Sequence, residues 1–305
     1  MKKQIISAAE LFLTAIIWGV AFVAQSVSMD YVEPFTFTCS RSFLGGLVLI
    51  PVIFLLRKIN PPSNTDSTPA IAAPKKSRRF YTVIGGICCG FFLCSATAFQ
   101  QFGIMYTTVC KAGFITALYI VIVPLLGIFM KKRIPGIVWL SCTIAIIGFY
   151  LLCLSGQVSL SKGDFLVLIC AILFSFHILV IDYFSPKGDA VVISCIQFFT
   201  CGVISSIFML IFETPSWSAI MDAAVPILYA GILSSGVAYT LQVVAQKNIA
   251  PSIATLIMSL ESVFSVLAGW VILGQALNGR ELLGCALVFI AVIMAQLPSG
   301  TKKIS

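Results

Sequence analysis

Long apolar stretches follow one another along almost the whole chain, and they decide what the chain can fold into. A helix needs about 20 apolar residues to cross the ~30 Å hydrocarbon core of a bilayer, and only helices or closed barrels satisfy their backbone groups in lipid. We expect ten membrane-spanning helices, at residues 8–28, 35–56, 81–102, 112–130, 135–154, 164–184, 190–212, 223–244, 251–273 and 281–297. The predicted fold class is therefore an all-α membrane protein with ten transmembrane helices.

The composition excludes most soluble classes. The 305 residues are 59% hydrophobic and 10% charged, with a mean hydropathy of +1.06, whereas about a quarter of an average globular chain is charged. The 11 cysteines lie almost wholly inside the apolar stretches, where cysteine packs as a small hydrophobe. Their spacings contain no CxxC pair, so we expect no metal site, disulfide framework or cofactor.

The distribution of the net charge of +8 predicts an orientation. Lys and Arg gather in alternate connectors, which marks the cytoplasmic side of a membrane protein. With the N-terminus inside, fifteen lie on the inner side and three, Lys111, Lys162 and Arg280, on the outer side. We therefore expect both termini in the cytoplasm and the chain in the cytoplasmic cell membrane. A basic stripe on a soluble domain is missing, so a nucleic-acid partner is not expected.

Two parts of the sequence resemble each other. Residues 112–119 and 254–261 have similar patterns, and their offset of 142 residues places Tyr119 opposite Glu261. The same offset pairs Gln100 with Gln242. These matches keep their order along the chain, which indicates an internal repeat.

Each repeat would contain five of the ten predicted helices. We expect a first repeat at residues 8–154, which includes a flexible cytoplasmic loop at 57–80 rich in proline, and a second at 164–297. Because five is odd, the second repeat must enter the membrane from the opposite side. Inverted repeats of this kind recur in secondary transporters, with the substrate site near the midplane between them.

Short motifs spread over residues 8–297 carry a family resemblance. They are Trp18-Gly19, Glu33-Pro34 followed by Arg41, Lys111-Ala112-Gly113-Phe114 running to Tyr119 and Pro124, and Ser259-Leu260-Glu261-Ser262-Val263-Phe264 followed by Leu273-Gly274-Gln275. In these motifs the chain resembles the drug/metabolite transporter (DMT) superfamily, specifically the EamA-type ten-helix transporters. The resemblance implies transport of small metabolites.

The chain departs from the EamA-type pattern at two positions. Ser262 stands where a proline commonly follows the glutamate, so the helix geometry beside Glu261 is left open. Gln275 stands where a second glutamate is frequent, so that position supplies no carboxylate for a mechanism.

Two titratable residues lie deep inside predicted helices. A carboxylate such as Glu261 costs roughly 2.5–3.5 kcal/mol at the centre of a membrane helix, so it normally faces a cavity or a partner. Glu261 is a candidate proton site, a candidate ligand for a substrate amine, or a structural partner for another helix. His177, the single histidine, is either a second proton site or a neutral side chain bonded to a neighbouring helix.

Other polar and aromatic residues within the predicted helices are candidates for a substrate cavity. Arg41 lies about two turns inside its helix and needs a partner or a wet cavity, with Asp30 and Glu33 as candidate partners. Lys111 either reaches an anionic substrate or extends to the membrane interface. The remaining candidates either line a pocket or bond and pack between helices. They are Trp18, Phe22, Gln100, Gln101, Tyr119, Tyr239 and Gln242.

The sequence predicts transport and no enzymatic activity. No HExxH, P-loop or GxSxG motif is present, and no ATP-binding domain accompanies the helices. We expect a secondary transporter, an exporter or exchanger, of small polar or amphipathic metabolites or amino acids that works by alternating access. Protons are a candidate second substrate, and a homodimer is compatible with the sequence. The alternatives are a passive facilitator or channel and, with less support, a membrane-embedded enzyme.

Overall fold

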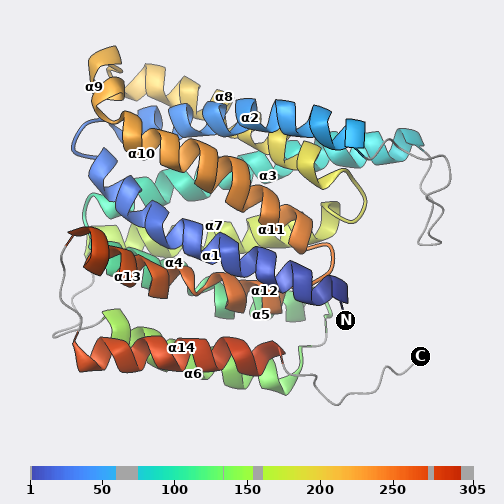
Figure 1. Ribbon diagram of the computed structural model, residues 1–305, viewed down its shortest axis with the longest axis vertical. Helices are drawn as coiled ribbons and strands as arrows, with labels where there is room; N and C mark the ends of the chain where they lie inside the picture. The colour runs from blue at the N-terminus through green and yellow to red at the C-terminus, as the bar shows by residue number, and fades with distance from the viewer. Residues whose placement is uncertain (1, 60–74, 133, 154–160, 274–277, 297–305) are drawn as a thin grey trace.

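The computed structural model describes residues 2–59, 75–132, 134–153, 161–273 and 278–296, and all regular structure in these residues is helical. The helices lie side by side in one bundle, with their long axes close to one direction (Figure 1). They are α1 Lys2–Ser28, α2 Pro34–Ile59, α3 Lys75–Ile104, α4 Val109–Thr116, α5 Tyr119–Phe129, α6 Gly136–Cys153, α7 Lys162–Phe184, α8 Ala190–Phe212, α9 Trp217–Asp222, α10 Ala224–Leu228, the π-helix η1 Tyr229–Tyr239, α11 Thr240–Ala245, α12 Pro251–Met258, α13 Glu261–Leu273 and α14 Gly279–Gln296.

Every range predicted to span the membrane contains helix. Within the described residues, eight helical stretches are long and apolar enough to cross a bilayer, and a shorter apolar helix covers Gly136–Leu151. The outer surface is correspondingly rich in large hydrophobic side chains, such as Phe129 at 84% and Val271 at 74% exposed. Water would disfavour such a surface, whereas lipid matches it.

Some details differ from the prediction. The stretches 112–130 and 251–273 each contain two helices, because the chain makes a tight turn within each. The predicted loop 57–80 is shorter, because α2 continues to Ile59 and α3 begins at Lys75. The remainder of that loop and Gln275 lie outside the described residues.

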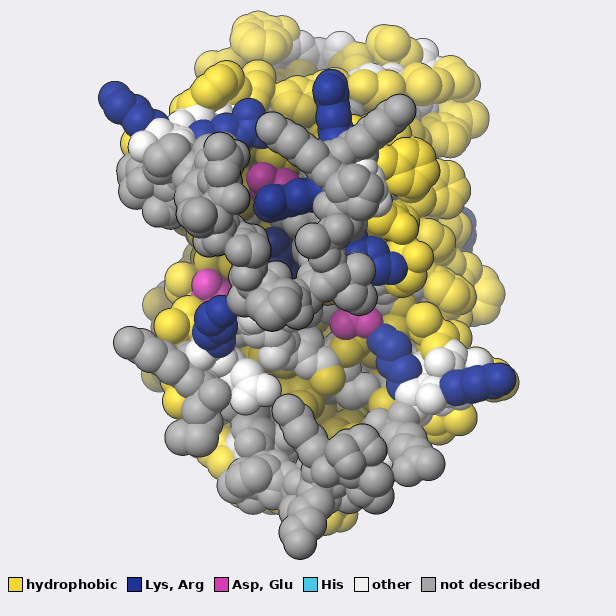
Figure 2. Space-filling view, turned by 90° about the vertical axis from the view of Figure 1, so that its right-hand side faces the viewer, with side chains coloured by type: hydrophobic (Ala, Val, Ile, Leu, Met, Phe, Trp, Pro, Cys, Tyr) yellow, Lys and Arg dark blue, Asp and Glu magenta, His cyan; other side chains and the backbone are white. Residues whose placement is uncertain are grey.

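Helix α1 begins and α14 ends at the same end of the bundle, on the right of Figure 1. Figure 2 looks onto this end and shows Lys and Arg side chains gathered there, above a flank of hydrophobic ones. The opposite end carries the short helix α9 (Figure 1). Cations thus gather at the end of the bundle where α1 begins.

The contacts between helices follow a symmetric pattern when the helices of the two halves are matched in order. A contact between one helix of the first half and one of the second has an equivalent between their two counterparts. For this comparison α4 and α5 form one stretch, and α10, η1 and α11 form another. The contact of α3 with α7 then corresponds to that of η1 with α1, and the contact of α3 with α8 corresponds to that of η1 with α2. The contact of α1 with α13 likewise corresponds to the contacts of α7 with α4 and α5. The contacts of α6 with α14 and of α2 with α8 each join a stretch to its own counterpart. This is the packing expected of two related halves.

Small residues form two of these corresponding contacts. A Cβ on Gly90 of α3 would lie 2.6 Å from the carbonyl oxygen of Gln197 in α8. A Cβ on Gly231 of η1 would lie 2.5 Å from the Leu44 side chain in α2. Membrane helices approach closely where such small residues remove side-chain bulk. Both helix pairs therefore pack tightly beside the centre of the bundle.

Candidate functional site

Two interrupted helices meet at the centre of the molecule. The first breaks between α4 and α5, the second between α12 and α13. Each break contains a backbone bond to the third residue before, from Leu118 N to Ile115 O and from Leu260 N to Ile257 O, both 3.2 Å long. The second half of each helix therefore starts inside the bundle. Its first N–H groups bond back to the turn, as from Ile120 N to Ala117 O at 3.0 Å and from Ser262 N to Ser259 O at 3.1 Å.

Serine hydroxyls support the second interruption. Ser259 Oγ donates to the Leu256 carbonyl oxygen at 2.8 Å, within its own helix. Ser262 Oγ donates to the Gly113 carbonyl oxygen at 2.8 Å, which lies in α4. The interruption beside Glu261 is thus present without the proline that EamA-type proteins commonly have there, and Ser262 ties the two interrupted helices together.

Tyr119 and Glu261 join the two interruptions. Tyr119 is the first residue of α5 and Glu261 the first residue of α13. The Tyr119 hydroxyl donates to Glu261 Oε1 at 2.8 Å, and the two residues are only 3% and 4% exposed. This is the only side-chain hydrogen bond of Glu261 within the described part of the chain.

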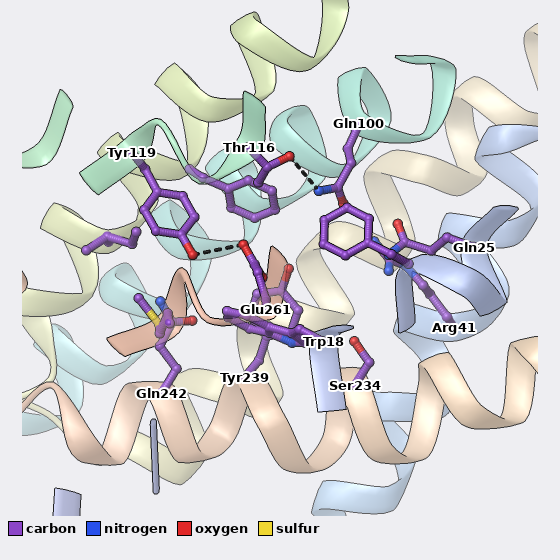
Figure 3. A pocket seen from close by; sticks show the side chains of 14 residues that line it. Trp18, Gln25, Arg41, Gln100, Thr116, Tyr119, Ser234, Tyr239, Gln242 and Glu261 are labelled. Atoms are coloured by element: carbon purple, nitrogen blue, oxygen red, sulfur yellow. Dashed lines mark hydrogen bonds between the residues drawn. The ribbon is translucent and has the colours of Figure 1, made fainter. Parts of the chain in front are cut away.

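These two residues form part of the wall of a pocket (Figure 3). The pocket contains about 440 Å³ of space unoccupied by atoms, its open side included. Half of its fourteen lining residues are aromatic or apolar and half are polar or charged, so it offers both kinds of surface to a small molecule. The lining residues come from both halves of the chain and are Trp18, Phe22, Gln25, Arg41, Gln100, Thr116, Tyr119, Phe174, Ile178, Ser234, Tyr239, Gln242, Met258 and Glu261.

Several polar atoms of these lining residues have no partner. Trp18 Nε1, Gln25 Oε1 and Gln242 Oε1 are buried and make no hydrogen bond in the described part of the chain. Buried polar groups are normally paired with protein or ordered water, so such atoms need an explanation. Their place in the pocket wall indicates hydrogen-bonding capacity for water or a small molecule inside it.

Arg41 brings a positive charge to the pocket that no carboxylate pairs among the described residues. It is 3% exposed and lines the pocket. Its guanidinium carbon lies 5.4 Å from the centre of the Phe37 ring. No carboxylate lies within 4.0 Å of the guanidinium among the described residues, where the ion pairs are Lys111–Asp164 and Lys132–Asp182. The predicted partners Asp30 and Glu33 therefore do not pair with Arg41.

Most residues proposed from the sequence line this pocket, and three do not. His177 is fully buried against α8, where its Nε2 lies 3.1 Å from Gln197 Oε1. Gln101 donates to the Gln25 carbonyl oxygen at 3.1 Å. Lys111 lies near the end of the bundle, 3.8 Å from Asp164, because its long side chain reaches a charged partner there.

The pocket also contains residues that the sequence analysis did not select. Gln25 follows Trp18 by seven positions and Phe22 by three, so helical spacing places all three on one face. Thr116 accepts a hydrogen bond from Gln100 Nε2 at 3.3 Å, a contact that no sequence pattern signals. The other residues missed are Phe174, Ile178, Ser234 and Met258.

Known proteins resemble this chain in both sequence and fold. An "Uncharacterized transporter" from Archaeoglobus fulgidus is 28% identical over 301 residues, covering 97% of this chain and 87% of the relative. A crystal structure superimposes with a TM-score of 0.73 at 19% identity, over 95% of this chain and 96% of the other, which shows a shared fold.

The model of the EamA-like transporter family matches the chain twice, at residues 6–154 and 161–296. The two matches lie on either side of the pocket and each supplies one interrupted helix. The residues that carried the resemblance in the sequence belong to these matched segments. The chain is thus a member of the EamA-like transporter family, within the drug/metabolite transporter superfamily.

Proposed function

We propose that the protein is a secondary transporter that moves small polar or amphipathic metabolites, amino acids included, out of the cell or in exchange. The observation that carries this proposal is the central pocket, which both repeats build where their interrupted helices meet. Trp18, Gln25 and Gln242 offer unpaired polar atoms in a wall that also contains aromatic and aliphatic side chains. Such a wall suits solutes with both polar and apolar parts.

Alternating access is the proposed mechanism, with ten spans arranged as two inverted repeats. The exchange of packing partners between the halves supports this arrangement. The two family matches support it as well, because five helical stretches in each would give them opposite directions through the membrane. Two equivalent halves that exchange conformations would open the pocket to one side and then to the other.

A counterflow assay tests the transport mechanism. Purified protein is first screened for solutes that raise its melting temperature, and a hit is then followed as a labelled tracer in proteoliposomes. A carrier should accelerate uptake of the tracer when the vesicles are preloaded with unlabelled solute. A channel should show no such acceleration and no saturation, and that result would replace the carrier with the passive alternative.

A matched pair of variants links this transport to the pocket. Ser234 lies in the pocket wall and is 2% exposed. Ser234→Leu should fill part of the space and abolish counterflow. Ser95→Leu makes the same change on the outer surface of α3, where the hydroxyl bonds only to Phe91 O. It should leave counterflow unchanged, and equal effects of both variants would argue against this pocket as the transport site.

The orientation is a separate proposal, with both termini in the cytoplasm. It rests on the cations gathered at the end of the bundle where α1 begins and α14 ends (Figures 1 and 2). Single cysteines at Ser216, near α9, and at Ser67, outside the described residues, test it in a cysteine-free background. An impermeant thiol reagent should label position 216 in intact cells and not position 67. The reverse labelling would invert the proposed orientation.

A further inference from the structure

The two charged groups of the pocket differ in how they are compensated. Glu261 accepts a hydrogen bond from Tyr119 and lies at the start of α13. Arg41 is equally buried, has the face of Phe37 beside it, and pairs with no carboxylate among the described residues. A charged side chain inside a membrane protein is stable when it is paired or faces a water-filled cavity. The pocket therefore presents one cation whose counter-charge has to come from outside the described residues.

The geometry of the pocket separates this cation from the carboxylate. Figure 3 shows Arg41 and Gln25 in one part of the pocket, and Tyr119, Glu261 and Gln242 in another, with Trp18 between them in the view. An ion pair between Arg41 and Glu261 is absent from the described residues. A molecule in the pocket would thus meet a positive end and an acidic end.

The chemistry of the guanidinium selects the group that it would bind. Arginine offers five N–H donors in a planar fork, which matches the two oxygens of a carboxylate. The nearby Gln25 Oε1 is unpaired and can accept a hydrogen bond from a donor next to that carboxylate. At the other end, Glu261 disfavours a second negative charge and favours a hydrogen-bond donor.

We infer that Arg41 is the anion-binding residue of the pocket and that the substrate carries a single carboxylate, with a hydrogen-bond donor at its other end. The inference rests on the proposed function of this pocket and names the class of its substrate. Phe174, Ile178 and Met258 supply apolar wall for the part of the solute between its ends. An ionised Glu261 would repel the second charge of a dicarboxylate, so we expect dicarboxylates to bind poorly.

Lys111 provides a contrast within the same protein. Its side chain is 26% exposed and its ammonium lies 3.8 Å from Asp164, so its charge already has a partner and access to solvent. It also does not line the pocket. A substitution at Lys111 therefore removes one positive charge without changing the proposed anion site.

Pairs of solutes that differ only at the carboxylate test the inference. The probes are glutamine with glutaminamide, 4-hydroxybutyrate with 4-hydroxybutyramide, and 4-aminobutyrate with 4-aminobutyramide, measured by calorimetry and thermal shift on purified protein. For at least one pair, the carboxylate member should bind about 10- to 100-fold more tightly, as expected for a hydrogen-bonded charge pair. Glutarate, a dicarboxylate, should bind no better than the amides. The absence of any preference for a carboxylate in the wild-type protein would overturn the inference.

Substitutions assign the preference to Arg41. Arg41→Gln should bring the carboxylate-to-amide affinity ratio close to 1, whereas Lys111→Gln should keep it at the wild-type value. Arg41→Lys keeps the charge without the planar fork and should give an intermediate affinity ratio. This ratio tests the assignment if Arg41→Gln does not fold. A wild-type ratio in the Arg41 variants, or an equal loss in Lys111→Gln, would contradict the assignment.

The inference and the proposed function can fail separately. If Arg41→Gln leaves the counterflow of a neutral or cationic solute intact, the result supports the transporter and contradicts the carboxylate site. If the protein prefers carboxylates through Arg41 but shows no counterflow, the result supports the binding site and contradicts the transport mechanism.

Discussion

The interrupted helix of the first repeat and that of the second share a backbone design and differ in chemistry. Both break through one tight turn, and both start their second half at the pocket. At the matching position the first repeat has Tyr119, a neutral donor, and the second has Glu261, an acidic acceptor. Related halves thus supply the same geometry twice, whereas the difference between the side chains gives the pocket one acidic end.

The surroundings of the two interruptions differ as well. The α12–α13 helix lies against α1, where Gly19 allows a very close approach to Phe264. The α4–α5 helix lies against α7 and has Pro124 within its second half. Tight packing and serine hydrogen bonds therefore hold the interrupted helix of the second repeat. We expect substitutions that add bulk there to destabilise the protein more than such substitutions at the α4–α5 helix.

Exchanging the two residues should have the largest effect. Tyr119→Glu places a carboxylate against Glu261 in a buried site, so we expect a loss of about 3–5 kcal/mol in the free energy of unfolding. The double variant Tyr119→Glu with Glu261→Tyr restores one donor and one acceptor and should regain most of that loss. Denaturation of purified protein in mild detergent measures both. A double variant no more stable than Tyr119→Glu would show that the two positions are not equivalent.

Adding a methyl group should distinguish the packing of the two interrupted helices. A Cβ at Gly19 would lie 2.4 Å from Phe264 Cβ and 2.7 Å from the Phe264 backbone carbon, which no rotamer change relieves. Gly19→Ala should therefore destabilise the protein by about 1–3 kcal/mol. A Cβ at Gly113 in α4 meets Ser265 Oγ at 3.2 Å, so Gly113→Ala should have a smaller effect. Equal changes in melting temperature would remove this difference between the two helices.

Removing the tyrosine hydroxyl tests the contact itself. Tyr119→Phe leaves the buried Glu261 carboxylate without its donor and should cost about 1–3 kcal/mol. Tyr239→Phe is the matched control, since Tyr239 lines the same pocket and its hydroxyl makes no hydrogen bond with the described residues. It should change the stability by less than about 0.5 kcal/mol. Similar losses in the two variants would argue that the Tyr119–Glu261 bond contributes nothing specific.

Glu261→Gln should have the smallest effect on stability and decides the role of the carboxylate. The amide oxygen still accepts from Tyr119, so the loss should be about 1 kcal/mol or less. If Glu261 couples transport to protons, counterflow should persist while the pH dependence of net transport disappears. If it is a structural partner, the melting temperature should fall and the pH profile of the remaining activity should stay unchanged. Wild-type stability together with a wild-type pH profile would refute both roles.

The sequence by itself determined the class, the helical ranges and most of the polar residues that reach the pocket. The reason is physical, because a bilayer requires helices of about 20 apolar residues and makes each polar exception expensive. Tyr119, Glu261, Gln100 and Gln242 stood out for that reason. The family followed from motifs on the same helices.

Only the tertiary structure decided how these residues meet. Hydropathy contains no signal for the breaks after Thr116 and Met258, since backbone hydrogen bonds hold both turns without a proline. Serine hydroxyls add to these bonds at the second break. The direction of a polar side chain depends on which helix packs beside it, so His177 turned toward α8 while Gln25 entered the pocket. For the same reason the unpaired state of Arg41 became visible only when all of its neighbours were in place.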